Sequence, residues 1–190
     1  MYEVEVKVPA SHDDVRRRLR DAGAERLERV AQTDTYYDAP HRDFAETDEA
    51  LRLRRESRGT DSASPVGEGE DTIKVTYKGP LIDDASKTRE EHETVVGDGD
   101  TAEAIFDGLG FEPAAVVEKE REFFDLDGYT VTLDRVAGLG EFIEVEAEAD
   151  DSADVERLRE GVFDVIRRLG LDPDDQIRTS YLGLLLVDEE

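Results

Sequence analysis

Charged and apolar residues alternate strictly in many short segments of this chain. The pattern is EVEVK at residues 3–7, LRLR at residues 51–54 and EVEAE at residues 144–148. Since successive side chains of an extended strand point to opposite faces, each segment would present one charged face and one apolar face. The alternation therefore predicts a chain built largely of β-strands, each with a charged side.

The order of the predicted elements indicates a closed sheet. Strands are expected at residues 2–8, 25–38, 50–58, 72–79, 87–97, 114–125, 129–136 and 141–148, and helices at residues 11–22, 100–110, 152–169 and 180–187. Asp127-Gly128 between two alternating runs is typical of a hairpin, and turns join most other neighbouring strands, so the sheet should be largely antiparallel. Eight strands without an obvious edge predict an α+β fold, a closed β-barrel with helices packed outside it.

The whole chain, residues 1–190, is interpreted as a single domain. A small, acidic and turn-rich segment at residues 59–71 interrupts the predicted strands. Its composition favours a mobile hairpin loop.

The charge of the chain limits the classes of partner. Its 190 residues include 24 Lys and Arg against 50 Asp and Glu, which gives a formal net charge of −26. Such a surface repels nucleic acids and anionic membranes, so neither is an expected partner. The absence of cysteine excludes thiolate zinc sites and a cysteine nucleophile, and three scattered histidines leave no zinc-type cluster.

The composition also carries a hypothesis about habitat. The basic residues are 19 Arg and only 5 Lys. An acid-rich, lysine-poor chain is typical of a halophilic protein, which stays in solution where salt screens its charges. The longest apolar run, residues 182–187, is too short to cross a membrane, and no signal peptide follows Met1, so we expect a cytoplasmic protein.

The charged faces of the strands are expected to point into the barrel. On any one strand, a charged face turned to solvent is the ordinary alternative. Helices between and after the strands need an apolar surface, however, which requires the apolar strand faces to lie outside. All five lysines lie in or beside predicted strands: Lys7, Lys74, Lys78, Lys87 and Lys119. An acidic chain that gathers Lys and Arg on strand faces is predicted to build a local positive site.

The mixture of charges indicates the chemistry of the ligand. Lys and Arg donate to phosphate oxygens, and Arg does so with two N–H groups, so rows of them favour a polyphosphate. Neighbouring carboxylates would repel that ligand unless they hold Mg²⁺ or Mn²⁺, which prefer oxygen ligands and bridge phosphates. The residues alone therefore predict a metal–triphosphate site inside the barrel.

Further motifs follow the first strand, whose EVEVK fits the pattern ExExK. They are DTYYD (residues 34–38), LRLR (51–54), TYKGP (76–80), KTREEHE (87–93), EKER (118–121), LDRVAGLGEFIEVE (133–146) and TSYLGLL (179–185). Together they resemble the CYTH superfamily, the triphosphate tunnel metalloenzymes, and are most similar to the branch labelled class IV adenylyl cyclase. The resemblance spans essentially the whole chain and implies an eight-stranded antiparallel tunnel with triphosphate inside it.

The resemblance also implies roles for particular residues. One or two ions, Mg²⁺ or Mn²⁺, would be held by Glu3, Glu5, Asp134, Glu144 and Glu146. The triphosphate would be bound by Lys7, Arg52, Arg54, Lys78, Arg89, Lys119 and Arg121. The candidate catalytic residues are Glu5, Lys7, Tyr36 and Lys78, since a tyrosine–lysine pair helps to activate water in the triphosphatase branch. Glu91, Glu93 and Glu148 are the acids for which an ordinary surface position competes best.

Three functions remain open at this point. The first is adenylyl cyclase activity, in which ATP gives cyclic AMP and pyrophosphate. The second is hydrolysis of tripolyphosphate, thiamine triphosphate or a nucleotide with release of orthophosphate. The third is a module that binds a polyphosphate or nucleotide without turnover. A homodimer is expected by resemblance alone.

Overall fold

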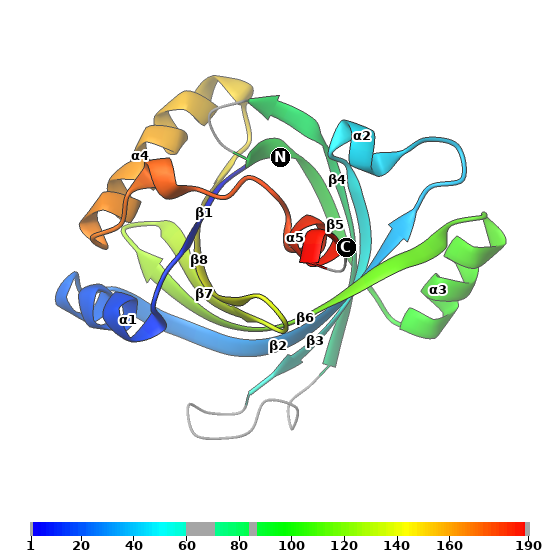
Figure 1. The fold of residues 1–190 in the computed structure, drawn as a ribbon, viewed down its shortest axis with the longest axis horizontal. Coiled ribbons are helices and arrows are strands. Elements are labelled where there is room, and N and C mark those ends of the chain that lie inside the picture. The colour runs from blue at the N-terminus through cyan, green and yellow to red at the C-terminus, as the bar shows by residue number, and fades with distance from the viewer. Residues whose placement is uncertain (1, 60–70, 84–86, 189–190) are drawn as a thin grey trace.

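A computed structural model describes residues 2–59, 71–83 and 87–188, so nearly all of the predicted acidic loop at residues 59–71 lies outside the described residues. Eight strands close into a barrel in the order β1-β5-β4-β3-β2-β6-β7-β8, and every neighbouring pair is antiparallel (Figure 1). The strands are β1 (Tyr2–Pro9), β2 (Glu25–Asp38), β3 (Ala50–Arg58), β4 (Asp71–Asp83), β5 (Lys87–Val96), β6 (Glu112–Leu126), β7 (Tyr129–Val136) and β8 (Gly140–Ala149). The predicted barrel is thereby confirmed.

Helices pack on the outside of the barrel, where the apolar strand faces are. α4 (Val155–Arg168) lies against β1 and β8, and α1 (His12–Asp21) lies against β8 (Figure 1). Val4 and Val6 of β1 are buried in one cluster with Val15 of α1 and with Val162 and Ile166 of α4. Because side chains alternate along β1, the charged residues between these valines point into the barrel. The predicted orientation of the faces is confirmed for this strand.

Three further helical segments lie at the rim of the barrel or against its side. α3 (Gly99–Gly108) packs against β3, and α2 (Phe44–Thr47) is a single turn in the connection between β2 and β3. α5 (Tyr181–Asp188) appears within the ring of strands in Figure 1. Tyr181 at its start packs with Val117, Val136 and Phe142. The first turn of α5 therefore covers one side of the barrel interior.

Local departures from the predicted elements have simple causes. The α2 turn lies between two predicted strands, where no helix is among the predicted elements; it forms because the Asp43 carboxylate caps it, accepting a hydrogen bond from the Ala45 backbone N–H at 2.8 Å. β4 continues past Gly79-Pro80 to Asp83, with register shifts against β5 that accommodate the proline. Two 3₁₀ turns, η1 (Ser152–Asp154) and η2 (Pro173–Asp175), flank α4.

The β6–β7 turn follows the prediction. Asp127 and Gly128 have φ of 56° and 85°, the left-handed conformations that a two-residue hairpin turn requires. In the described part of the chain, no helix is long and apolar enough to cross a membrane.

Candidate active site

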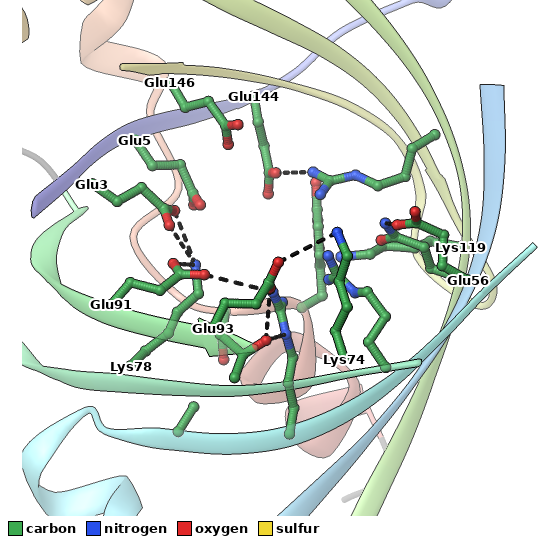
Figure 2. Close-up of a pocket in the computed structure, with 18 of the residues that line it drawn as sticks. Glu3, Glu5, Glu56, Lys74, Lys78, Glu91, Glu93, Lys119, Glu144 and Glu146 are labelled. Carbon is green, nitrogen blue, oxygen red and sulfur yellow. Dashed lines mark hydrogen bonds and ion pairs between the residues drawn. The ribbon is translucent and has the colours of Figure 1, made fainter. Parts of the chain in front are cut away.

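The interior of the barrel holds a cavity of about 370 Å³ whose lining is mostly charged (Figure 2). All but one of the residues predicted for the site line it: Glu3, Glu5, Lys7, Tyr36, Arg52, Arg54, Lys78, Arg89, Lys119, Arg121, Glu144 and Glu146. Asp134 lies behind this lining and is fully buried. The cavity walls also include Lys74 and the three acids for which a surface position was the alternative, Glu91, Glu93 and Glu148.

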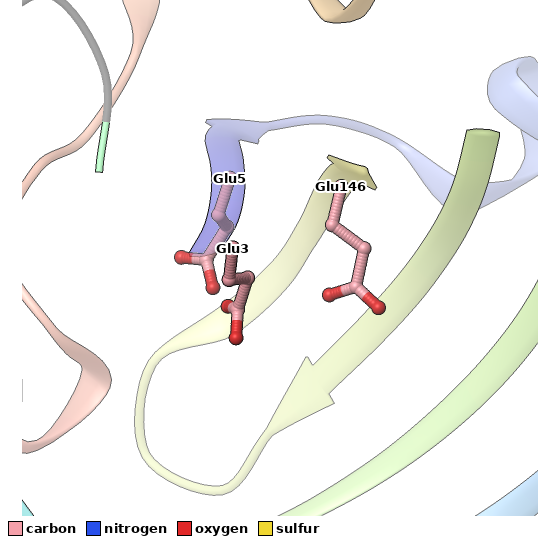
Figure 3. A group of neighbouring side chains, drawn as sticks. All are labelled: Glu3, Glu5 and Glu146. Atoms are coloured by element: carbon pink, nitrogen blue, oxygen red, sulfur yellow. The ribbon is translucent and has the colours of Figure 1, made fainter. Parts of the chain in front are cut away.

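Three carboxylates form a compact group at one side of the cavity. Glu3 and Glu5 are successive inward residues of β1, and Glu146 of β8 is the register partner of Glu5. One oxygen from each lies within 4.8 Å of the others (Figure 3). We call Glu3, Glu5 and Glu146 the carboxylate trio.

The environment of the trio suits a divalent cation. Burial raises the pKa of Glu146 to about 8, and the neighbouring charge of Glu3 adds to this effect. Burial likewise raises the pKa of Glu3, against the opposing effect of Lys78. These raised pKa values mean that the ionised carboxylates lack enough positive charge around them. A bound cation would neutralise their negative charge and favour the ionised form. Several carboxylate oxygens in one place are the donors that Mg²⁺ and Mn²⁺ prefer. The trio therefore fits the expected metal.

The structure does not bring Asp134 and Glu144 into the trio. Asp134 accepts hydrogen bonds from Nε and Nη2 of Arg121 at 2.6 and 2.9 Å. Its Oδ2 also accepts from the Tyr181 hydroxyl at 2.8 Å. Glu144 is bonded to Arg121 as well and lies 4.0 Å from Nζ of Lys7. Both acids thus hold cations of the cavity in place.

A second buried acid, on β2, anchors cations across the barrel from the carboxylate trio. Asp34 of β2 is entirely buried and forms a bidentate ion pair with Arg54. Its Oδ2 also lies 3.4 Å from Nζ of Lys119 and 3.7 Å from Nη1 of Arg52. These three cations hold the pKa of the Asp34 carboxyl well below its usual range, although burial alone would raise it. Asp34 thereby brings together three of the residues predicted to bind the triphosphate.

Two of the three candidate lysines, Lys78 of β4 and Lys119 of β6, have different electrostatic surroundings. Lys78 contacts Glu3 at 2.9 Å and Glu91 at 2.8 Å. Although burial opposes it, this pairing raises the pKa of Lys78, so its ammonium stays charged. Lys119 is buried beside Arg121, and burial together with that arginine lowers its pKa to about 7, against the opposing effect of Asp34. Figure 2 shows Lys119 across the cavity from Glu3 and Glu5.

Two tyrosines lie among these charges. Tyr36 lines the cavity, and burial raises the pKa of its phenol, so it remains neutral. The ring of Tyr181 lies under the Lys7 ammonium, with Nζ 4.0 Å from the ring centroid, in cation–π geometry. Tyr181 therefore links α5 to the charged network.

Sequence reasoning did not select Asp34 or Tyr181. Strand periodicity held a signal for Asp34, because it shares a face of β2 with Tyr36 two residues later. No local pattern indicates Tyr181, since its position depends on how α5 docks against the barrel.

Comparison with known proteins agrees with this geometry. The sequence profile of the CYTH domain matches residues 1–181. This chain belongs to the CYTH family. CYTH proteins are metal-dependent enzymes that bind triphosphate substrates in a tunnel, and the cavity and carboxylate trio of this chain occupy such a tunnel.

Relatives place this CYTH chain near proteins named as cyclases. It is 36% identical over 185 residues to "Putative adenylate cyclase MJ0240" of Methanocaldococcus jannaschii, covering 97% of this chain and 98% of the relative. It is 26% identical over 159 residues to the adenylate cyclase CyaB of Aeromonas hydrophila, covering 83% of this chain and 74% of the relative. The solved structure of the PH1819 protein of Pyrococcus horikoshii superposes with a TM-score of 0.87 at 37% identity, covering 98% and 99% of the two chains. The predicted class IV adenylyl cyclase-like branch is thus confirmed.

Proposed function

We propose that this CYTH protein is a class IV adenylyl cyclase, which converts ATP to cyclic AMP and pyrophosphate with the help of Mg²⁺ or Mn²⁺. The observation that carries the proposal is the arrangement of charge in the tunnel. The carboxylate trio lies on β1 and β8, and Lys119, one of the cations gathered by Asp34, lies across the cavity from Glu3 and Glu5 (Figure 2). A metal–triphosphate complex presents both signs of charge and is complementary to this arrangement.

Glu3, Glu5 and Glu146 are the residues that would hold the metal. The bound ion would supply neutralisation of the phosphate charge and a lower pKa of the reacting hydroxyl. Glu3 also accepts from Lys78, with its two oxygens at 2.9 and 3.0 Å from Nζ. This contact keeps a cation next to the trio, where it can donate to a phosphate oxygen.

The cations on the other walls bind and orient the triphosphate. Arg52, Arg54 and Lys119 surround Asp34, so their positions are set before the ligand arrives. Arg121 is held in the same way by Asp134 and Glu144. Guanidinium groups held by carboxylates keep their remaining N–H groups free for phosphate oxygens.

The covalent step of the proposed cyclase joins the ribose to the α-phosphate of the same ATP. The ribose 3′-oxygen bonds to the α-phosphorus and its proton passes to solvent, while the bond from that phosphorus to the α,β-bridging oxygen breaks and pyrophosphate leaves with this oxygen. Negative charge grows on the departing pyrophosphate, where fixed cations stabilise it most. Arg52, Arg54 and Lys119 would stabilise the negative charge on the departing pyrophosphate.

Hydrolysis of a triphosphate is the second candidate function, and the position of Tyr36 and Lys78 favours it. Both line the tunnel, as the resemblance to triphosphatases implies. Lys78 stays charged beside Glu3 and Glu91, so it would orient or stabilise an attacking water rather than deprotonate it.

Phosphorus NMR separates these functions. The purified protein is incubated in molar KCl with Mg²⁺ or Mn²⁺, first with ATP and then with tripolyphosphate. Cyclic AMP with pyrophosphate supports the cyclase, and orthophosphate release overturns it in favour of the hydrolase. Binding of both compounds without turnover would leave a binding module as the function.

A further inference from the structure

The row of basic residues on the inward face of β3 is interrupted by one acid, Glu56. Arg52, Arg54, Glu56 and Arg58 are successive residues on one face of this strand, and all line the tunnel. Glu56 is only 4% exposed. Its Oε2 accepts a hydrogen bond from Gln32 Nε2 at 2.7 Å, and its Oε1 lies 3.8 Å from Nε of Arg58. The buried carboxylate of Glu56 would repel a phosphate group. The part of the tunnel wall around Glu56 therefore suits a ligand group that donates a hydrogen bond.

Gln32 of β2 has an unused acceptor in the same wall. Its side chain is 3% exposed, and its carbonyl Oε1 has no hydrogen-bond partner among the described residues. Because the Glu56 carboxylate only accepts, the amide nitrogen of Gln32 must face it and the carbonyl must face away. The nitrogen keeps a second hydrogen. Within the described part of the chain, the amide therefore has one acceptor and one donor without a partner beside the cavity that Gln32 lines, and leaving such groups unpaired in a buried site is costly.

An aromatic ring lies farther along the same side of the tunnel. Lys119, Arg121 and Phe123 are successive inward residues of β6. Lys119 pairs in register with Gln32, and Phe123 pairs with Glu28 of β2. Gln32 and Glu56 thus lie level with Lys119, and the aromatic face of Phe123 lies farther along the tunnel, past Arg121.

We propose that Gln32 and Glu56 recognise the base of a nucleoside triphosphate and select adenine over guanine. This inference rests on the proposed action on a nucleoside triphosphate. The free carbonyl and N–H of a glutamine amide match the exocyclic amine and N7 of adenine, which donate and accept side by side. Glu56 accepts from the other hydrogen of the amide nitrogen and so fixes the amide in this orientation. Guanine presents two acceptors, O6 and N7, at this edge, so Oε1 of Gln32 would repel its O6. Phe123 supplies a face on which the ring can stack.

Calorimetric binding of three unreactive ligands tests the inference. The ligands are analogues of ATP, GTP and tripolyphosphate in which methylene groups replace both anhydride oxygens, each titrated with Mg²⁺ in molar KCl. The wild-type protein should bind the ATP analogue at least about tenfold more tightly than the GTP analogue. Gln32→Met, which keeps the length of the side chain, should weaken the ATP analogue about tenfold and leave the tripolyphosphate analogue within about twofold. Glu56→Gln should reduce the preference for adenine while preserving a partner for Gln32.

A matched control lies one residue along β2. The side chain of Thr33 is on the opposite face of the strand from Gln32, so Thr33→Val should change none of the three affinities. Equal affinity for the ATP and GTP analogues in the wild type would overturn the inference and leave the proposed triphosphate site intact. An equal loss of all three ligands in Gln32→Met would also overturn it, because Gln32 would then support the phosphate site. Failure of the wild type to bind the tripolyphosphate analogue would contradict the proposed function itself, and this inference with it.

Discussion

Asp34 accepts two hydrogen bonds from the guanidinium of Arg54, at 2.6 and 2.7 Å, in the fully buried wall of the tunnel. The same carboxylate lies 3.4 Å from Nζ of Lys119 and 3.7 Å from Nη1 of Arg52. One acid therefore fixes the positions of three cations that would otherwise repel one another. A polyanion entering the tunnel meets a cluster that is already organised, which reduces the entropy lost on binding.

Asp34→Asn tests this anchoring role. The amide keeps the shape of the side chain but leaves buried cations without their counter-charge, so the free energy of unfolding should fall by about 3–5 kcal/mol. Asp38→Asn, at the exposed end of the same strand, should change it by less than about 0.5 kcal/mol. Urea denaturation with and without tripolyphosphate measures both, and the ligand should restore part of the loss in Asp34→Asn. Equal stability of the two variants would show that Asp34 is dispensable.

Glu5→Gln tests the metal site. Loss of one of the three charges in the trio should weaken Mn²⁺ binding at least tenfold, or about 1.4 kcal/mol, because the remaining donors neutralise the ion less well. Electron paramagnetic resonance of free Mn²⁺ gives the affinity directly, without any assay of activity. Glu118→Gln, at an exposed position on β6, is the control and should bind as the wild type does. Unchanged Mn²⁺ binding in Glu5→Gln would remove the trio as the metal site.

The raised pKa of Glu146 predicts a pH dependence of stability in the metal-free protein. The folded state keeps this proton up to about pH 8, whereas the unfolded chain releases it near pH 4.5. Between these values the folded state binds more protons, so the contribution of Glu146 falls as pH rises, by up to about 1.4 kcal/mol per pH unit. Glu146→Gln removes this effect. The variant should therefore gain stability relative to the wild type from pH 5 to pH 8, as measured by denaturation in EDTA. A difference that does not vary with pH would contradict the assignment.

The lowered pKa of Lys119 predicts proton uptake when triphosphate binds. The ammonium is charged below about pH 7 and loses its proton above that value. A bound polyanion favours the charged form, so the affinity for tripolyphosphate should fall as pH rises from 6 to 8. Calorimetry in buffers with different ionisation enthalpies counts the protons. Lys119→Arg stays charged throughout this range, so it should take up fewer protons and bind with a weaker pH dependence. The same proton uptake in both proteins would exclude Lys119 as its source.

The sequence by itself determined the strands and their faces. EVEVK in β1 and LRLR in β3 alternate with a period of two, and this period fixes which side chains share a face whatever the barrel's final shape. Asp127-Gly128 likewise determined a hairpin, because its left-handed conformations are a local property. Membership of the CYTH family follows from the order of such motifs.

Only the tertiary structure decided which of the inward residues meet. Glu3 and Glu5 join Glu146, while Asp134 and Glu144 turn to Arg121, because the closure and register of the barrel set distances between strands far apart in sequence. Alternation predicts only that all five acids point into the barrel, and it carries no information about the distances between them. The free amide oxygen of Gln32 and the ring of Tyr181 under Lys7 have the same origin. Both arise from the packing of segments that have no local sequence relationship to each other.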